Sequence, residues 1–150
     1  MSDRVLVSAC LLGQRCRYDG AARPAPHLRA RLDAEWPGAE VVPVCPEELG
    51  GLGTPRPAAQ LSGGDGTAVL RGEARVLIVD GGADVTGAFV AGAERALDAA
   101  PDASGAILKA RSPSCGCGET WIDGALTGGR GVFAALLMRR GIRVKTDEDR

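Results

Sequence analysis

The chain is short of histidine and of aromatic residues, and each shortage excludes a class of site. His27 is the single histidine among 150 residues, so a Cys2His2 zinc site is excluded and only one histidine is available as a base. Five aromatic side chains in the whole chain are few for a platform that stacks the bases of single-stranded nucleic acid. Chemistry at an active site must therefore come mainly from other side chains.

An excess of basic residues is also missing. Lys and Arg together number 18 and Asp and Glu 19, which gives a net charge of −1 and argues against a broad nucleic-acid surface. Arginine outnumbers lysine 16 to 2, but glycine and proline are plentiful too, so we attribute the arginines to GC-rich coding. We therefore expect no nucleic-acid partner. The charge does not decide the assembly state, for which we expect a monomer or weak homodimer.

No apolar run approaches the roughly 18 residues that a membrane-spanning helix requires. The segment Val7–Cys10 resembles a lipoprotein cleavage box, but only four residues precede the apolar run, which is too short a start for a secretory signal. Five cysteines, an odd number, indicate metal binding or thiol chemistry in a reducing compartment rather than a disulfide framework. A cytoplasmic location is expected.

The pattern of apolar residues predicts strands that alternate with helices in one domain, residues 1–150. An α/β fold follows, with a mostly parallel sheet flanked by helices (Rossmann-like) and one β-hairpin. The segment 46–57 is expected to be a turn-rich loop, and the tail 146–150 to be frayed. The expected strands are 4–9, 40–45, 105–109 and 142–144, the helices 27–35, 83–99 and 132–140, and the hairpin strands 67–70 and 75–79.

Three cysteines follow predicted strands. Cys10, Cys45 and Cys115 each lie at or just beyond the carboxyl end of a strand, which is where open α/β sheets bind ligands. A free cysteine is often only a small buried apolar residue, but three in the same topological position favour a shared site. Thiolates suit zinc or an iron–sulfur cluster. Three of them would leave one iron of a cubane cluster without a protein ligand.

Several motifs resemble a single bacterial family, the thiouracil desulfidases, long catalogued as a domain of unknown function. The resemblance covers the chain from Val5 to about Val144, with the motifs in family order, and together they are specific. The motifs are Val7–Gly13 (VSACLLG), Cys16–Gly20 (CRYDG), Val44–Leu52 (VCPEELGGL), Thr54–Pro57 (TPRP) and Lys109–Gly116 (KARSPSCG).

This resemblance implies a [4Fe–4S] cluster bound by Cys10, Cys45 and Cys115. It also implies a non-redox reaction that converts 2- or 4-thiouracil, or a related thiolated pyrimidine, to uracil and sulfide. The thiocarbonyl sulfur would bind the iron that lacks a protein ligand, and water would attack the carbon. Glu47 and Ser112 are the implied catalytic residues.

Each of these assignments has an alternative. Glu48 competes with Glu47 as the acid, Ser114 competes with Ser112, and any of these side chains can simply stabilise its own loop. The segment Gly128–Gly131 before a helix could bind an anion, although a flexible helix entry is the better interpretation. Asp19 and Arg56 could orient a substrate, or be only charged loop residues. The residues without an assigned role are Cys16, His27 and Cys117.

Two other functions are considered. One is a non-enzymatic module that binds zinc or sulfur, and the other is a desulfidase that acts on thiouridine within tRNA. The short chain and its lack of positive charge favour a free base or nucleoside over tRNA.

Overall fold

The computed structural model describes residues 3–149 and contains two four-stranded sheets. The first has the strand order β2-β1-β5-β8 and is entirely parallel. Its strands are β1 (Arg4–Ser8), β2 (Glu40–Val44), β5 (Gly105–Leu108) and β8 (Val144–Thr146). These match the strands predicted from the sequence to within a few residues.

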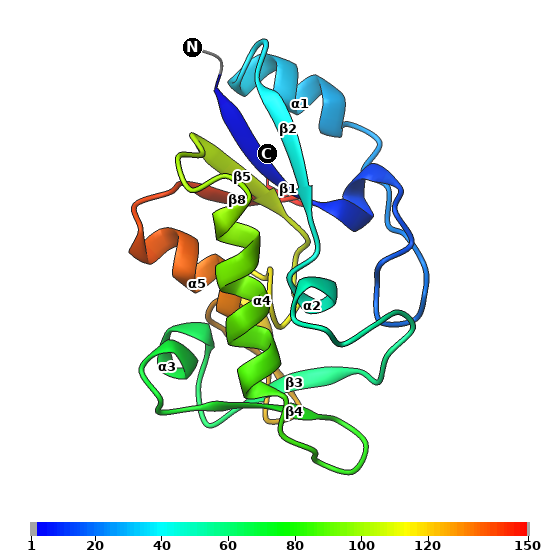
Figure 1. Ribbon diagram of the computed structural model, residues 1–150, viewed down its shortest axis with the longest axis vertical. Helices are drawn as coiled ribbons and strands as arrows, with labels where there is room; N and C mark the ends of the chain where they lie inside the picture. Colours follow the sequence, from blue (N-terminus) through cyan, green and yellow to red (C-terminus); the bar gives the residue numbers. More distant parts are fainter. Residues whose placement is uncertain (1–2, 150) are drawn as a thin grey trace.

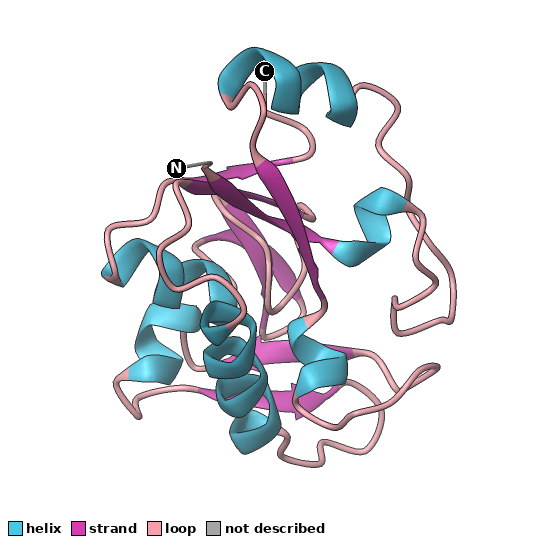
Figure 2. Cartoon of the chain, turned by 45° about the horizontal axis from the view of Figure 1, so that its top comes forward, coloured by secondary structure: helices cyan, strands magenta, loops and turns pink. Residues whose placement is uncertain are grey.

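Helices cover both faces of the parallel sheet (Figures 1 and 2). On β1, Val5 and Val7 pack with α1 (Leu28–Glu35), whereas Leu6 points to the opposite face. That face packs against α4 (Thr86–Asp98) and α5 (Val132–Arg139). The alternation of strand side chains thus fills two apolar layers, which confirms the expected α/β class with its Rossmann-like layers.

The second sheet lies below the first in Figure 1 and has the order β4-β3-β6-β7. Only the β3–β6 pair is parallel. Its inner side chains, such as Leu61 and Val76, join the core formed by α4 and α5. The strands are β3 (Ala59–Ser62), β4 (Arg75–Ile78), β6 (Glu119–Ile122) and β7 (Ala125–Gly128).

The hairpin predicted at 67–70 and 75–79 is wrong. Residues Gly66–Leu70 form a helix, α3, because the Asp65 side chain accepts a hydrogen bond from the Ala68 amide and caps its first turn. Arg75–Ile78 is a strand, but it pairs with β3. The tight hairpin instead joins β6 and β7 through Asp123 and Gly124, both at positive φ.

Segment 46–57 is also more ordered than predicted. Pro46–Leu49 forms a short helix, α2, which packs on α4. Glycine makes this contact possible, because a Cβ at Gly92 would lie 1.8 Å from the Pro46 carbonyl oxygen and one at Gly50 would lie 2.1 Å from the Ala88 oxygen. Close packing on α4 therefore sets where α2, and Glu47 within it, sits.

The end of the chain, predicted to be frayed, is bonded to the rest. Thr146 belongs to β8, and the Asp147 carboxylate accepts a 2.7 Å hydrogen bond from the Ala110 amide. Glu148 pairs with Arg111; Arg150 lies outside the described residues. Across residues 3–149, no helix has the length and apolar character that crossing a membrane requires.

Candidate active site

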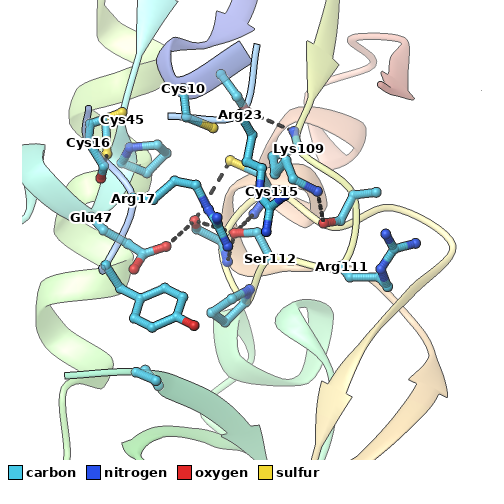
Figure 3. Close-up of a pocket in the computed structure, with 18 of the residues that line it drawn as sticks. Cys10, Cys16, Arg17, Arg23, Cys45, Glu47, Lys109, Arg111, Ser112 and Cys115 are labelled. Atoms are coloured by element: carbon cyan, nitrogen blue, oxygen red, sulfur yellow. Dashed lines mark hydrogen bonds between the residues drawn. The ribbon is translucent and has the colours of Figure 1, made fainter. Parts of the chain in front are cut away.

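Cys10, Cys45 and Cys115 come together at the carboxyl edge of the parallel sheet. Cys10 lies in a short 3-10 helix (Ala9–Leu12) directly after β1, Cys45 lies between β2 and α2, and Cys115 follows β5. All three line one cavity of about 800 Å³ (Figure 3). The three cysteine-bearing segments therefore converge at one place, as their positions after strands predicted.

The loop that carries Cys115 is fixed by the first turn of α5. The amides of Phe133 and Ala134 donate to the Ser114 carbonyl oxygen at 2.8 and 3.1 Å, and the Val132 amide donates to Pro113. The free donors at the start of α5 are thus used by the protein itself, which supports a helix entry over an anion site at 128–131.

Burial dominates the acidity of the three thiols. It raises the pKa of Cys115 to about 12 and raises the pKa values of Cys10 and Cys45 above their ordinary value. The nearby Lys109 and Arg56 act in the opposite direction on Cys10 and Cys45, respectively. A metal centre here has to displace these protons, so its binding would release them to solution.

Glu47 is held by hydrogen bonds to both carboxylate oxygens. Arg56 Nε donates to Oε1 at 3.0 Å, and Ser114 Oγ donates to Oε2 at 2.9 Å. The side chain is 14% exposed and lines the cavity. Glu48, by contrast, does not line the cavity and accepts a hydrogen bond from Thr54. The geometry therefore favours Glu47 over Glu48 as the acidic group of the site.

Ser112 and Ser114 both face the cavity, but their bonds differ. Ser112 Oγ accepts hydrogen bonds from the backbone amides of Ser114 and Cys115 at 3.2 and 3.1 Å. Its oxygen lies 3.1 Å from Ser114 Oγ, which in turn contacts Glu47 and lies 3.7 Å from Cys115 Sγ. Ser114 is 1% exposed, so it links Glu47 to Ser112 from within the wall.

The two remaining cysteines occupy different surroundings. Cys16 is buried, lines the same cavity, and its carbonyl oxygen lies 3.6 Å from Cys45 Sγ. Burial raises its pKa far above the ordinary value. Cys117 packs against the main core and is not among the cavity residues. Proximity thus distinguishes Cys16 from Cys117, although the sequence left both without a role.

Arg56 and Asp19, considered from sequence as residues that orient a substrate, bond within the protein. The Arg56 guanidinium is buried against Glu47. Asp19 accepts a hydrogen bond from the Ala21 amide and pairs with Arg17 at 3.6 Å. His27 is exposed at the start of α1 and is not among the cavity residues.

Sequence reasoning missed part of the cavity wall. Lys109 lines it and pairs with Asp147 at 4.0 Å, and Trp121 and Gln60 line it from the second sheet. Lys109 stood within a recognised motif, so its place could have been anticipated. Asp147 fell in the tail expected to be frayed, and the second sheet brings Trp121 and Gln60 to the site only through long-range pairing.

The donor set fits an iron–sulfur cluster. It consists of three thiols from three segments, and soft thiolate ligands suit iron–sulfur centres. Among residues 3–149, no three His, Cys, Asp or Glu side chains lie close enough to bind a single metal ion. A cubane cluster differs from a single ion in that each cysteine binds a different iron atom.

Comparison with known proteins identifies the family. A family model described as 2-thiouracil desulfurase matches residues 5–149. A Bacillus subtilis (strain 168) relative, described as uncharacterized protein YbbK, is 40% identical over 151 residues, which cover 97% of this chain and 96% of the relative.

A solved structure described as the [4Fe–4S]-dependent thiouracil desulfidase TudS has a TM-score of 0.77 and 38% identity to this chain. The alignment covers 97% of this chain and 91% of the chain in that structure. The alignment therefore includes both sheets of this chain. With the family model matching almost every described residue, the chain belongs to the 2-thiouracil desulfurase family.

Proposed function

We propose that this protein is a [4Fe–4S]-dependent desulfidase that converts a thiolated pyrimidine, such as 2- or 4-thiouracil, to uracil and sulfide. The observation that carries the proposal is that three cysteines line the same cavity as a glutamate that accepts two hydrogen bonds. The name of the TudS structure, which shares 38% of its residues, supports both the cofactor and the substrate class.

Cys10, Cys45 and Cys115 would hold the cluster. When bound, it supplies an iron without a protein ligand, a soft Lewis acid that suits a thiocarbonyl sulfur. Lys109 has the largest charge effect on Cys10, so its ammonium group would offset the negative charge that three thiolates bring to the cavity. The remaining chemistry falls to this chain's own polar side chains.

Glu47 would act as the base that takes a proton from the attacking water. Its Oε1 accepts from Arg56 and its Oε2 from the Ser114 hydroxyl, so Oε2, which has the neutral partner, would be the oxygen that takes the proton. Two backbone amides donate to the Ser112 oxygen, and because the Ser114 proton goes to Glu47, the Ser112 hydroxyl is the donor to Ser114 Oγ at 3.1 Å. This proton would turn to the substrate ring or to the water when substrate is bound. General acid–base assistance of this kind contributes about 10²–10⁴-fold to a rate.

The reaction balances without electron transfer. One water adds to the thiocarbonyl carbon, its oxygen stays as the carbonyl of uracil, and the sulfur leaves as hydrogen sulfide with the two protons of that water. Glu47 accepts one of these protons and later returns it, so the side chain ends in its starting state. No oxidant or reductant is consumed.

The second sheet would hold the pyrimidine ring. Trp121 is 47% exposed, yet it lines the cavity, and Tyr18 does the same from the loop after Cys16. Exposed aromatic side chains bind a flat heterocycle by stacking; on Tyr18 one face already carries the Arg17 guanidinium, 5.6 Å from the ring centroid, so Trp121 is the better candidate. A cavity of about 800 Å³ accommodates a free base or a nucleoside.

The activity is tested on anaerobically purified protein. We expect about four iron atoms and four acid-labile sulfides per chain, and equal amounts of uracil and sulfide from 2- or 4-thiouracil. One zinc per chain with no iron would instead support the zinc-binding module. Faster sulfide release from thiolated tRNA than from the free base or nucleoside would show that thiolated tRNA is the substrate.

We further propose that residues 1–150 act as one catalytic domain, as a monomer or weak homodimer in the cytoplasm. The five cysteines are free, which suits a reducing compartment. Sedimentation of the cluster-loaded protein over a range of concentrations tests the assembly state, and activity that requires a stable higher oligomer would contradict it.

A further inference from the structure

Arg56 is a buried guanidinium that joins three segments of the site. Its side chain is only 5% exposed. Nε donates to Glu47 in α2 at 3.0 Å, Nη2 donates to the Cys16 carbonyl oxygen at 2.9 Å, and Nη1 donates to Gly53 and Thr54 at 2.9 and 3.0 Å. The fork of an arginine can hold several acceptors in fixed directions, which a lysine cannot.

The contact with Glu47 determines which way the carboxylate faces. Arg56 occupies Oε1, and this leaves Oε2 to Ser114 on the side of the Cys115 loop. Both members of the pair are largely buried, so neither is free to exchange its partner for water. The orientation of Glu47 is therefore set before any substrate enters.

The hydrogen bond from Arg56 to Cys16 connects Arg56 to the surroundings of Cys45, a candidate cluster ligand. The Cys16 carbonyl oxygen accepts from Arg56 and also lies 3.6 Å from Cys45 Sγ. A thiolate bound to iron has no proton to donate, so Arg56 would be the donor that continues to hold this carbonyl in the loaded protein. One side chain thus fixes both the acidic group and the loop beside Cys45.

We infer that Arg56 is the positioning residue of the desulfidase site: it holds the Glu47 carboxylate in its reactive orientation and acts on the reaction through Glu47. This inference rests on the proposed function. The sequence allowed a role for Arg56 in orienting the substrate. In the structure its N–H groups donate to Glu47 and to three backbone or hydroxyl oxygens of the protein instead. The residue it orients is the base.

The test compares Arg56→Met with Arg75→Met. Arg75 also forms an ion pair, with Asp84 at 3.6 Å, but its side chain is 66% exposed and outside the cavity. For Arg56→Met we expect kcat to fall by about 100-fold, the cost of a small misplacement of a catalytic group, with KM changed less than about threefold. Arg75→Met should match the wild type in kcat, KM and iron content.

Arg56→Lys serves as the variant that keeps the charge. An ammonium group cannot bond Glu47, Cys16 and Gly53 at once, so we expect kcat about tenfold below the wild type, with the iron content and visible absorption of the cluster unchanged. Wild-type kcat in Arg56→Lys would overturn the inference, since the geometry of the fork would then be irrelevant.

Rescue separates a positioning role from a purely structural one. Guanidinium ion added to Arg56→Ala should raise kcat saturably, and the same ion should have no effect on Arg56→Ala combined with Glu47→Gln. Rescue that is equal in the double variant would show that Arg56 does not act through Glu47. Loss of the cluster from Arg56→Ala without any rescue would likewise overturn it.

The proposed function and this inference fail in different ways. Wild-type protein with a full complement of iron that releases no sulfide from 2- or 4-thiouracil contradicts the function itself. An active wild type in which Arg56→Met and Arg75→Met behave alike contradicts only the positioning role.

Discussion

The two sheets contribute different things to one cavity. The parallel sheet supplies its chemistry, because Cys10, Cys45 and Cys115 all follow its strands. The second sheet supplies a wall with Gln60 and Trp121 and none of the candidate ligands. Parallel strands end at a common edge and so gather reactive loops, whereas a sheet of short and mostly antiparallel strands offers a surface.

The cysteines provide the strongest test of this division. Replacing Cys10, Cys45 or Cys115 with alanine should abolish the cluster, because each removes one of three protein ligands. Iron and acid-labile sulfide analysis of the anaerobic proteins measures the loss.

Cys16→Ala and Cys117→Ala are the matched controls and should keep the full complement of iron. Cys16 is the sharper control, since it lines the same cavity. If Cys16→Ala loses the cluster while Cys45→Ala retains it, the ligand set is wrong.

The parallel sheet was predictable because its strands are apolar runs and its ligands follow them. On β1, Val5, Leu6 and Val7 are completely buried, so this continuous apolar run of the sequence corresponds directly to core residues. The second sheet was largely missed because strands such as Ala125–Gly128 are exposed and short. The pairing of Leu61 with Ile122, 61 residues further along, is what makes them a sheet.

The two hydrogen bonds that Glu47 accepts from Arg56 and Ser114 could not be predicted either. Motif resemblance selected Glu47 and Ser112, but the Ser114 hydroxyl meets Glu47 across 67 residues of sequence. This contact depends on α2 packing against α4 and on α5 holding the Cys115 loop. For α3, by contrast, Asp65 was a readable N-cap signal, overridden by the strand-like pattern of residues 67–70.

Glu47 gives the next largest effect, on turnover and not on the cluster. Glu47→Gln keeps the shape but removes the base, so kcat should fall by about 10²–10⁴-fold while iron content stays at the wild-type level. Steady-state sulfide release measures kcat. Glu48→Gln is the control, because Glu48 does not line the cavity; a larger loss in Glu48→Gln would exchange the two assignments.

Trp121 tests the second sheet as a binding wall. Trp121→Ala should raise KM by about tenfold through the loss of stacking, with a change in unfolding free energy below about 1 kcal/mol for a half-exposed side chain. Leu126 is 42% exposed and directly opposite Trp121 in the β6–β7 pair, but it does not line the cavity. Equal KM values for Leu126→Ala and Trp121→Ala would show that Trp121, and with it the second sheet, does not contribute to substrate binding.

The smallest effect concerns Arg111, which ties the two sheets together by charge. Its guanidinium pairs with Glu148, just after β8 of the parallel sheet, and with Glu119 of β6 at 3.8 Å. The hydrogen bonds from Arg111 lower the pKa of Glu148 below its ordinary value of 4.5. Stability from this pair is therefore present above pH 4.5 and is lost as the pH falls through the lowered pKa.

Glu148→Gln should reduce the free energy of unfolding by less than about 1 kcal/mol at pH 7, because the Glu148 side chain is half exposed and solvent screens the pair. Urea titrations of the variant and the wild type at pH 7 and at pH 3 measure the difference, which should shrink at the lower pH as the wild-type carboxylate takes up a proton. A difference that grows as the pH falls would show that Glu148 stabilises the protein in its neutral form. The link between the two sheets would then depend on hydrogen bonding and packing, not on charge.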